Sequence, residues 1–317
     1  MVWLVPAALA LDLLLGDPRF LPHPVVWIGR LITRLELLAA LVTNQRLAGI
    51  ALVVTTLGAT GLATWGLLAL AALFHPLLQG VLALWLAYTT LALRSLHRES
   101  REVVELVAEG SLEEARRALS LLVGRQTSHL DREGVLRACL EKVAANTSDA
   151  VIAPLFYLFI GGPVAALLFR AASTLDSMIG YQTERYSPLG WTAAWLDDLL
   201  NWPPARLTAL LMVLAAPLVG LRPWGALRIT LRDARKIQSP NAGWPEAAAA
   251  GALGVQLGGE AIYFGQTVAR PTLGDASRPL TIDSYRRMVR LMYMTSLLAL
   301  GLGVGIHLVL ARAFGAP

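Results

Sequence analysis

The sequence predicts an all-α fold: a polytopic integral membrane helical bundle with broken or re-entrant helices and a cytoplasmic helical segment. Of the 317 residues, 56% are hydrophobic and only 15% are charged, whereas soluble domains carry about 25% charged residues. Long uncharged runs recur along the chain, and no stretch shows a convincing strand pattern. This composition excludes a disordered chain, a nucleic-acid-binding domain and an ordinary soluble enzyme. We expect residues 1–317 to form one membrane-embedded domain.

Three firm membrane spans are predicted. No charged residue occurs over 47–93, and a His-Pro dipeptide divides this run into two apolar arms. Arms of this length can cross about 30 Å of hydrocarbon, so we predict a transmembrane hairpin. Residues 291–311 are uncharged and flanked by arginines, which predicts a C-terminal transmembrane helix. The apolar segment ahead of Asp17 lacks the positive start of a signal peptide, so we expect it to be retained as a fourth span.

Two further apolar runs leave alternatives open. Residues 150–169 are uncharged, but Gly-Gly-Pro at 161–163 breaks the run in its middle. Either one span or two half-helices that form a re-entrant hairpin fits this pattern. Residues 207–221 form a shorter run that contains Pro217. Its length is typical of a buried or interfacial helix.

The polar segment 94–149 is predicted to form three helices. Ten of the chain's 22 acids lie in it. We expect Gly110 to end the first helix, a capping box at Ser111 to open the second, and a cap near Asp131 to open the third. Most charges of this segment are expected on a solvated face.

Basic residues predict which side of the membrane the loops face. Four lysines and arginines lie in 16–46, nine in 94–149 and ten in 222–290, but only three lie in 170–206. The positive-inside rule places the first three stretches in the cytoplasm. We therefore expect a multi-pass protein of the inner cell membrane, with the lipid bilayer as a partner and no nucleic acid.

Common catalytic signatures are absent from the sequence. No GxxxxGK[ST], strand-borne GxGxxG, HExxH or GxSxG pattern occurs, and the five histidines are scattered. Cys139 is the only cysteine, which excludes an intrachain disulfide and a cysteine-based metal site. The candidates that remain are acids and amides beside apolar runs, where charge is costly.

The first candidates lie on both sides of the broken run. Asp17, in a Gly-Asp-Pro turn, either caps a helix or binds metal or substrate with His23. Asn146 and Asp149 directly precede 150–169, and Asp176 follows it. Asp149 and Asp176 share a site only if the run reverses, because a spanning run would place them on opposite faces of the membrane. The alternative role for Asp149 is that of a helix N-cap.

Two later blocks suit a divalent cation and phosphate. Adjacent Asp197 and Asp198, with Asn201 one helical turn on, offer the oxygen ligands that Mg²⁺ prefers. Two prolines follow, so a helix-terminal charge cluster is the alternative. The polar loop DARKIQSPNAGWPEA combines two cations with several oxygen donors. It is either a phosphate cradle or a surface loop.

Together these blocks resemble one family. LDLLLGDP with PHPV, NTSDAVIAPLFY, TLDSMIGY, LDDLLNWPPARL, SPNAGWPEAAAAGAL and LGGEAIYFG occur in this order between about residues 11 and 295. In this respect the chain is similar to the adenosylcobinamide-phosphate synthases of cobalamin (vitamin B12) biosynthesis. The resemblance implies a membrane ligase that joins adenosylcobyric acid to an aminopropanol, as its O-phosphate, with ATP and Mg²⁺. It also implies association with other membrane enzymes of the corrinoid pathway.

Under this hypothesis the residues take three roles at one cytoplasmic-side site. The expected Mg²⁺ ligands are Asp149, Asp176, Asp197 and Asp198. The expected substrate- and phosphate-binding residues are Asn146, Tyr181, Asn201, Arg235, Lys236, Ser239 and Asn241. The amine proton is expected to pass to Asp17, His23 or Glu246. A single site favours the re-entrant interpretation of 150–169, with neither open run crossing fully.

Three alternatives belong to other classes. One is a non-catalytic membrane sensor, because a family linked to β-lactamase regulation is distantly similar. Another is a transporter with broken helices, although no inverted repeat is visible. The third is a Mg²⁺-dependent membrane transferase acting on a diphosphate, which usually carries two Asp-rich motifs, whereas DDLLN occurs once.

Overall fold

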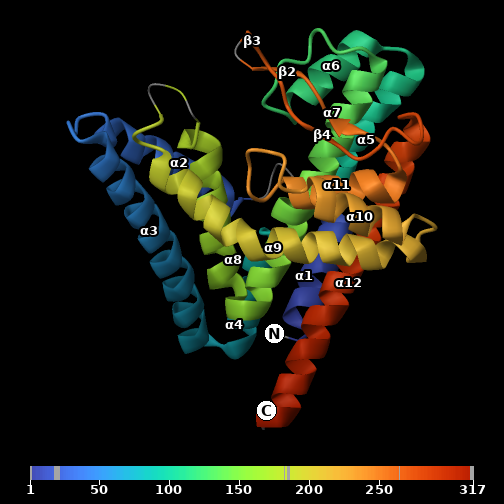
Figure 1. Cartoon of the computed structure of the whole chain (residues 1–317). Helices are drawn as coiled ribbons and strands as arrows, with labels where there is room; N and C mark the ends of the chain where they lie inside the picture. The colour runs from blue at the N-terminus through green and yellow to red at the C-terminus, as the bar shows by residue number, and fades with distance from the viewer. Residues whose placement is uncertain (1, 18–21, 182, 184–185, 264, 315–317) are drawn as a thin grey trace. The chain divides into compact units, whose positions relative to one another are not determined.

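The computed structural model describes residues 2–17, 22–181, 183, 186–263 and 265–314. The protein is an all-α polytopic membrane protein, and Figure 1 shows its helices. The apolar helix α1 (Leu4–Leu15) is shorter than a span. Five segments are long and apolar enough to cross a membrane: Gln45–Phe74, Pro76–Glu109, Arg132–Ile179, Trp191–Leu218 and Ile282–Phe314. Three of them cover runs predicted as firm spans, and the other two contain the runs left open.

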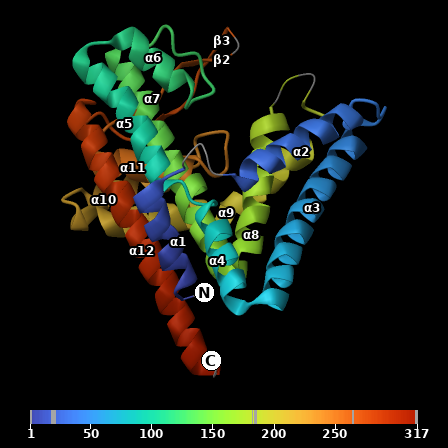
Figure 2. The ribbon, with the colours of Figure 1, turned by 180° about the vertical axis from the view of Figure 1, so that it is seen from behind.

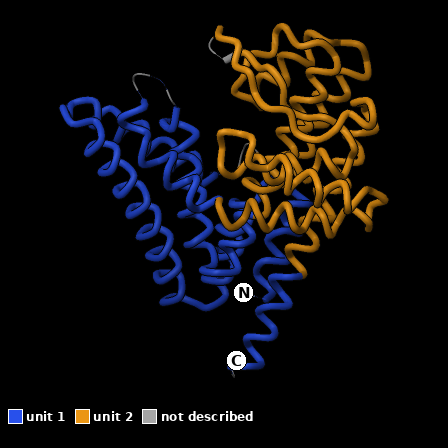
Figure 3. The backbone as a smooth tube through the Cα atoms, in the orientation of Figure 1, with its two compact units in different colours: residues 1–92, 153–201, 302–317 blue, residues 93–152, 202–301 orange. Residues whose placement is uncertain are grey.

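The chain divides into two compact units, coloured in Figure 3, and each is described by itself. Unit 1 comprises residues 1–92, 153–201 and 302–317, and unit 2 comprises residues 93–152 and 202–301. The single membrane-embedded domain expected over 1–317 stays a prediction.

Unit 1 is a bundle of apolar helices. It contains α1, α2 (Pro24–Ala39), α3 (Gln45–Phe74), α4 (Pro76–Tyr88), α8 (Ala153–Ile179) and the start of α9 (Trp191–Leu218). α2 and α3 lie side by side, as the two opposite views in Figures 1 and 2 show. Their buried faces meet α8 in a core that includes Ile32, Leu52 and Leu175. The His-Pro break separates α3 from α4, where the His75 Nδ1 atom accepts a hydrogen bond from the Leu77 amide at 3.1 Å.

α8 turns back on itself in its middle. Gly161 and Gly162 leave the helical conformation, and Gly162 has φ 62°, which favours glycine. The ring of Tyr157 stacks on that of Phe169 with centroids 5.1 Å apart. Twelve residues of continuous helix would separate them by about 18 Å. The run 150–169 therefore belongs to two half-helices, and Pro163 lies at the start of the second, where its missing amide costs nothing.

α9 corrects the interpretation of 207–221 as a separate short helix. It is assigned as one continuous helix of 28 residues, and Pro203, Pro204 and Pro217 lie inside it. A proline at 204 cannot donate to the carbonyl of Leu200. The hydroxyl of Tyr157 donates to that carbonyl at 2.8 Å instead. Tertiary packing thus supplies the partner that the sequence removes, and the helix continues.

Unit 2 contains the polar helices and two small sheets. Its helices are α5 (Leu93–Glu109), α6 (Leu112–Ser120), α7 (Arg132–Thr147) with a π-helical turn at Ser148–Ile152, residues 202–218 of α9, α10 (Pro223–Asp233), α11 (Gly243–Leu253) and the first part of α12 (Ile282–Phe314). The first three are the helices expected in 94–149. Gly110 ends α5 with φ 86°, and Asp131 caps α7 by accepting from the Gly134 amide at 2.7 Å. Ser111 makes no side-chain capping bond, contrary to the predicted capping box.

The strands were not expected from the sequence. β1 (Leu257–Gly258) pairs antiparallel with β4 (Thr272–Leu273), and β2 (Ala261–Tyr263) pairs with β3 (Gln266–Val268). Strands of two or three residues are too short to show an alternating pattern. They hold the segment after α11 against α7, because the β1 residue Gly258 is hydrogen-bonded to Glu141.

Candidate functional site

A network of buried charges lies at the centre of unit 2. Glu141 on α7 is only 3% exposed and forms an ion pair with Arg125. It also accepts a hydrogen bond from the Gly258 amide at 2.7 Å and lies 3.5 Å from the Arg270 guanidinium. Arg270 reaches on toward Glu246 on α11, with Nη2 3.9 Å from Oε2. A buried carboxylate is tolerated only when it is paired in this way.

Glu246 is the predicted catalytic residue with the most altered environment. It is 4% exposed. Burial and the nearby charge of Glu141 raise the pKa of Glu246 to about 8, against the opposing effect of Arg270 and Arg125. Asp149 also lies near enough to raise the pKa of Glu246. The structure therefore brings two predicted residues, Glu246 and Asp149, into one charged region, and Asn146 lies three residues before Asp149.

The predicted phosphate loop is held mainly by its own ion pairs. The Lys236 Nζ atom lies 2.5 Å from Asp233, which is fully buried. Asp233 also accepts two hydrogen bonds from Arg232 and one from the Gly274 amide at 2.8 Å. These bonds, those of Arg232 first, hold the pKa of Asp233 well below its usual range. Lys236 thus has a structural partner in Asp233, and its phosphate-binding role stays a prediction.

The other members of this loop differ in how they are engaged. The Ser239 hydroxyl accepts from the Asn241 amide at 3.3 Å, and the Asn241 side chain accepts from Arg206 at 2.9 Å. The Arg206 guanidinium lies over the ring of Trp244, 4.7 Å from its centroid. Arg235 makes no ion pair with any residue that the structure describes. It is the loop cation best able to bind an added anion.

In unit 1 the structure brings Asp17 and His23 together. Their side chains lie 3.6 Å apart, from His23 Nε2 to Asp17 Oδ1. His23 Nδ1 accepts from the Val25 amide at 3.3 Å, so His23 and not Asp17 caps α2. Because Nδ1 is an acceptor here, the ring proton of neutral His23 belongs on Nε2, facing Asp17.

Three predicted acids of unit 1 lie on α8 and α9. Asp176 and Asp198 are near enough for their charges to interact. Asn201 is buried, and its Oδ1 atom has no hydrogen-bond partner in the described part of the chain. Its amide nitrogen donates to the backbone carbonyl of Asp197 at 3.2 Å. Tyr181 is exposed, and its ring lies 6.2 Å from that of Tyr186.

No preformed metal cage is present among the described residues, because no three His, Cys, Asp or Glu side chains converge. Asp149 belongs to unit 2, whereas the other three predicted Mg²⁺ ligands belong to unit 1. Within unit 1, Asp176, Asp198 and the Oδ1 atom of Asn201 are the oxygen donors that suit Mg²⁺, which often takes one or two carboxylates together with phosphate oxygens.

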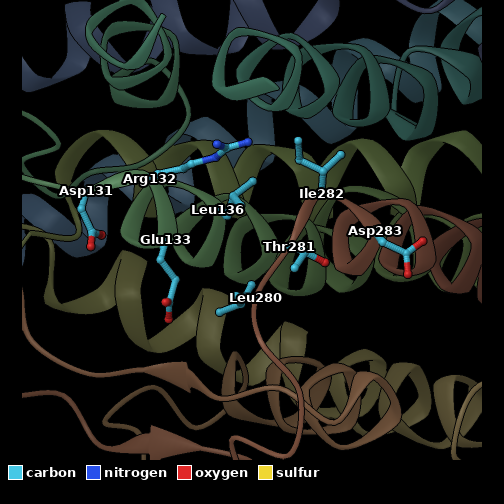
Figure 4. Close-up of a pocket in the computed structure, with 8 residues that line it drawn as sticks. All are labelled: Asp131, Arg132, Glu133, Leu136, Leu280, Thr281, Ile282 and Asp283. Atoms are coloured by element: carbon cyan, nitrogen blue, oxygen red, sulfur yellow. The ribbon is translucent and has the colours of Figure 1, made fainter. Parts of the chain in front are cut away.

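A pocket of about 540 Å³ in unit 2 lies where α7 and α12 begin. Figure 4 shows Asp131 and Glu133 at one end, Asp283 at the other, and Arg132, Leu136, Leu280, Thr281 and Ile282 between them. Each acid already has a local partner: Asp131 caps α7, Glu133 pairs with Arg137, and Asp283 pairs with Arg287. These pairings explain the acids without a ligand.

Comparison with known proteins identifies the family of this chain. The family model described as "CobD/Cbib protein" matches residues 5–292. The chain belongs to the CobD/CbiB family. No solved structure matches it.

Several curated relatives cover nearly the whole of this CobD/CbiB chain. "Cobalamin biosynthesis protein CobD" of Geobacter metallireducens is 56% identical over 290 residues, which are 91% of each chain. The CobD protein of Pelobacter propionicus is 52% identical over 92% of this chain and 90% of its own. "Cobalamin biosynthesis protein CbiB" of Salmonella arizonae is 46% identical over 93% of this chain and 94% of its own.

Three members of the charge network in this CobD/CbiB chain are not predicted from the sequence. Arg125 and Glu141 lie in the segment whose charges are mostly expected on a solvated face, and Arg270 lies among the short strands. One signal was available for Glu141. It lies in the apolar stretch ACLEKVAA, and the helical neighbours Ala138 and Ala144 on its own face are buried.

Proposed function

We propose that this chain is an amide-bond-forming synthase of cobalamin biosynthesis. It joins adenosylcobyric acid to the amine of aminopropanol O-phosphate, with ATP and Mg²⁺, on the cytoplasmic side of the inner membrane. The observation that carries the proposal is the match to the CobD/CbiB family over residues 5–292. The names of relatives that cover more than nine-tenths of the chain support the pathway.

The proposed chemistry has two steps. A carboxylate is a poor electrophile, so its oxygen first takes the γ-phosphoryl group of ATP, which gives an acyl phosphate and ADP. The amine nitrogen then attacks the acyl carbon, the bond to phosphate breaks, and inorganic phosphate leaves. One proton of the attacking ammonium must pass to a base before the attack. Positioning and charge neutralisation supply most of the catalysis in the first step.

Glu246 is the base best suited to the amine. The ionised form of a carboxylate whose pKa lies near 8 holds a proton more firmly than an ordinary one, so transfer from an ammonium is less uphill. Because most Glu246 side chains already hold a proton near pH 7, the base is the ionised fraction, which grows as pH rises toward 8. In its observed arrangement His23 has no acceptor nitrogen left, since Nδ1 already accepts from Val25. Asp17, which faces His23, is the second candidate.

Phosphate and metal are assigned to separate groups of residues. Arg235 binds a phosphate oxygen, and Lys236 contributes charge from its pair with Asp233. Asp176, Asp198 and Asn201 would hold Mg²⁺, which neutralises charge on the transferred phosphoryl group. The buried Oδ1 atom of Asn201 without a partner supports this assignment.

Purified protein in detergent tests the reaction. Incubation with adenosylcobyric acid, aminopropanol O-phosphate, ATP and Mg²⁺ should give the amide and one ADP per amide, both measured by mass spectrometry. Formation of neither product by folded protein would overturn the proposal. Asp198→Asn should weaken Mg²⁺ binding measured by calorimetry, whereas the exposed, locally paired Asp283→Asn should not.

A further inference from the structure

A second pocket of unit 2 lies outside the site described above. It measures about 280 Å³ and lies between α5 and the start of α12. Its lining consists of His97, Arg101, Val104, Glu105 and Ala108 from α5, and Ile282, Tyr285 and Arg286 from α12. None of these residues takes part in the proposed reaction.

The floor of this pocket is built from fixed polar groups. Tyr285 is buried, and its hydroxyl shares a hydrogen bond with Ser100 at 3.0 Å. The His97 ring is bonded through Nδ1 to the Tyr293 hydroxyl at 2.9 Å. This bond orients the His97 ring at the pocket wall. The polar surface is therefore arranged before any ligand arrives.

The rim of the pocket is basic. Arg101 uses its Nε atom to bind Glu105 at 2.6 Å, and its side chain remains largely exposed. Arg286 is exposed and makes no ion pair with a described residue. Two guanidinium groups against one carboxylate leave the pocket with net positive charge, which suits an anion with oxygen donors.

The short distance between this pocket and the ends of the uncharged helical runs indicates that its ligand is a lipid. The uncharged run in α12 begins at Leu291, five residues after Arg286, which is about 7.5 Å of helix. The other uncharged run ends at Leu93, eight residues or about 12 Å before Arg101. Lipid headgroups occupy roughly 5–8 Å beyond each face of the hydrocarbon. Arginine stems are long enough to bring their charge to that layer.

We propose that this pocket binds the headgroup phosphate of an anionic phospholipid. The guanidinium groups of Arg286 and Arg101 hold the phosphate oxygens, and His97 and Tyr285 form the polar wall and floor beside them. Basic pockets at membrane helix ends recognise anionic headgroups by this combination of charge and donors. The assignment does not depend on the proposed amide synthesis.

Native mass spectrometry of the full-length protein in detergent tests the site with phosphatidylglycerol and phosphatidylcholine as probes. Phosphatidylglycerol should bind in preference, and Arg286→Gln and Arg101→Gln should each lower its affinity about fivefold. Arg312→Gln, an exposed arginine at the other end of the same helix, should leave the affinity unchanged. Equal binding of the two lipids, or equal affinity in all variants, would overturn the proposal.

Two further arms separate lipid from other sources of phosphate and from misfolding. Glycerol 1-phosphate, which carries the phosphate without acyl chains, should not displace phosphatidylglycerol at equal concentration; if it does, the pocket is a site for soluble phosphate compounds and the lipid assignment is wrong. Arg286→Lys keeps the charge and should retain most of the affinity that Arg286→Gln loses. A loss of equal size in both variants would contradict a charge-based site.

Discussion

Glu141 is the residue on which the charge network of unit 2 depends. Replacing it with glutamine leaves the buried Arg125 without its carboxylate and leaves Arg270 with only the more distant Glu246. We expect Glu141→Gln to lower the free energy of unfolding by about 3–5 kcal/mol, because removing one partner strands buried charge. Glu133→Gln on the same helix breaks only an exposed pair and should cost less than about 1 kcal/mol. Denaturant unfolding in detergent measures both, and equal losses would contradict a buried network.

Asp233 provides a pH test of the same principle. Its pKa is held below the ordinary value, chiefly by the hydrogen bonds from Arg232, so the folded state binds fewer protons than the unfolded one. This stabilisation is present above the unfolded pKa, near 3.9, and is lost as pH falls through that value toward the lower folded pKa. We expect Asp233→Asn to lower the melting temperature at pH 7, and the difference from the native protein to shrink near pH 3. A difference independent of pH would contradict the assignment.

The Asp17–His23 pair and the charge network around Glu141 differ in how far the sequence predicts them. Asp17 and His23 are six residues apart, so a short turn is enough to bring them together. Glu141 is bonded to groups at positions 125, 258 and 270. Two of these lie more than a hundred residues away: Gly258 is on the short strand β1, and Arg270 is in the segment between β3 and β4, and neither stretch shows a periodic pattern. Local sequence carries no information about such a pairing.

At the scale of the helix, α9 depends on α8. The Tyr157 hydroxyl occupies the Leu200 carbonyl that Pro204 leaves without a donor. We expect Tyr157→Phe to destabilise the protein by about 1 kcal/mol, because a half-buried acceptor loses its partner. Pro204→Ala restores the backbone donor, so Tyr157→Phe should cost much less in that background. Unfolding free energies of the four proteins in this cycle measure the coupling, and additive effects would show that the hydroxyl does not replace the missing amide.

The same two helices show where sequence patterns succeed and fail. Gly-Gly-Pro predicts a break in α8, and the stacking of Tyr157 on Phe169 confirms the reversal. Pro203-Pro204 suggests a helix end, but α9 continues because a side chain from another helix supplies the missing partner. A glycine breaks a helix through the conformation of its own backbone, so its position in the sequence is enough to predict the break. The amide that a proline lacks is replaced by a tertiary contact, which the sequence does not reveal.

At the scale of the whole molecule, composition predicts the fold class and leaves the assembly of the site open. Low charge and long apolar runs predict a polytopic helical membrane protein, and five segments have the length and apolarity to cross. The predicted site residues are spread over both units, seven in each. Short sequence blocks therefore identify the family and the local clusters of site residues. These clusters can form one active site only if those of unit 1 and those of unit 2 face the same compartment.

This requirement makes a prediction about sidedness. Ser187 in unit 1 and Ser277 in unit 2 are exposed, and Ser187 lies between the predicted site residues Tyr181 and Asp197 in the sequence. Cys139 is buried, so a cysteine introduced at either position should be the only one that reacts. We expect a membrane-impermeant maleimide to label Ser187→Cys and Ser277→Cys in inverted vesicles but not in intact cells. His75→Cys, between the two arms of the predicted hairpin, should show the opposite pattern and serves as the control. Labelling of Ser187→Cys only from outside would place the acids of α8 and α9 near the opposite face from the phosphate loop, and one cytoplasmic site could then not contain both.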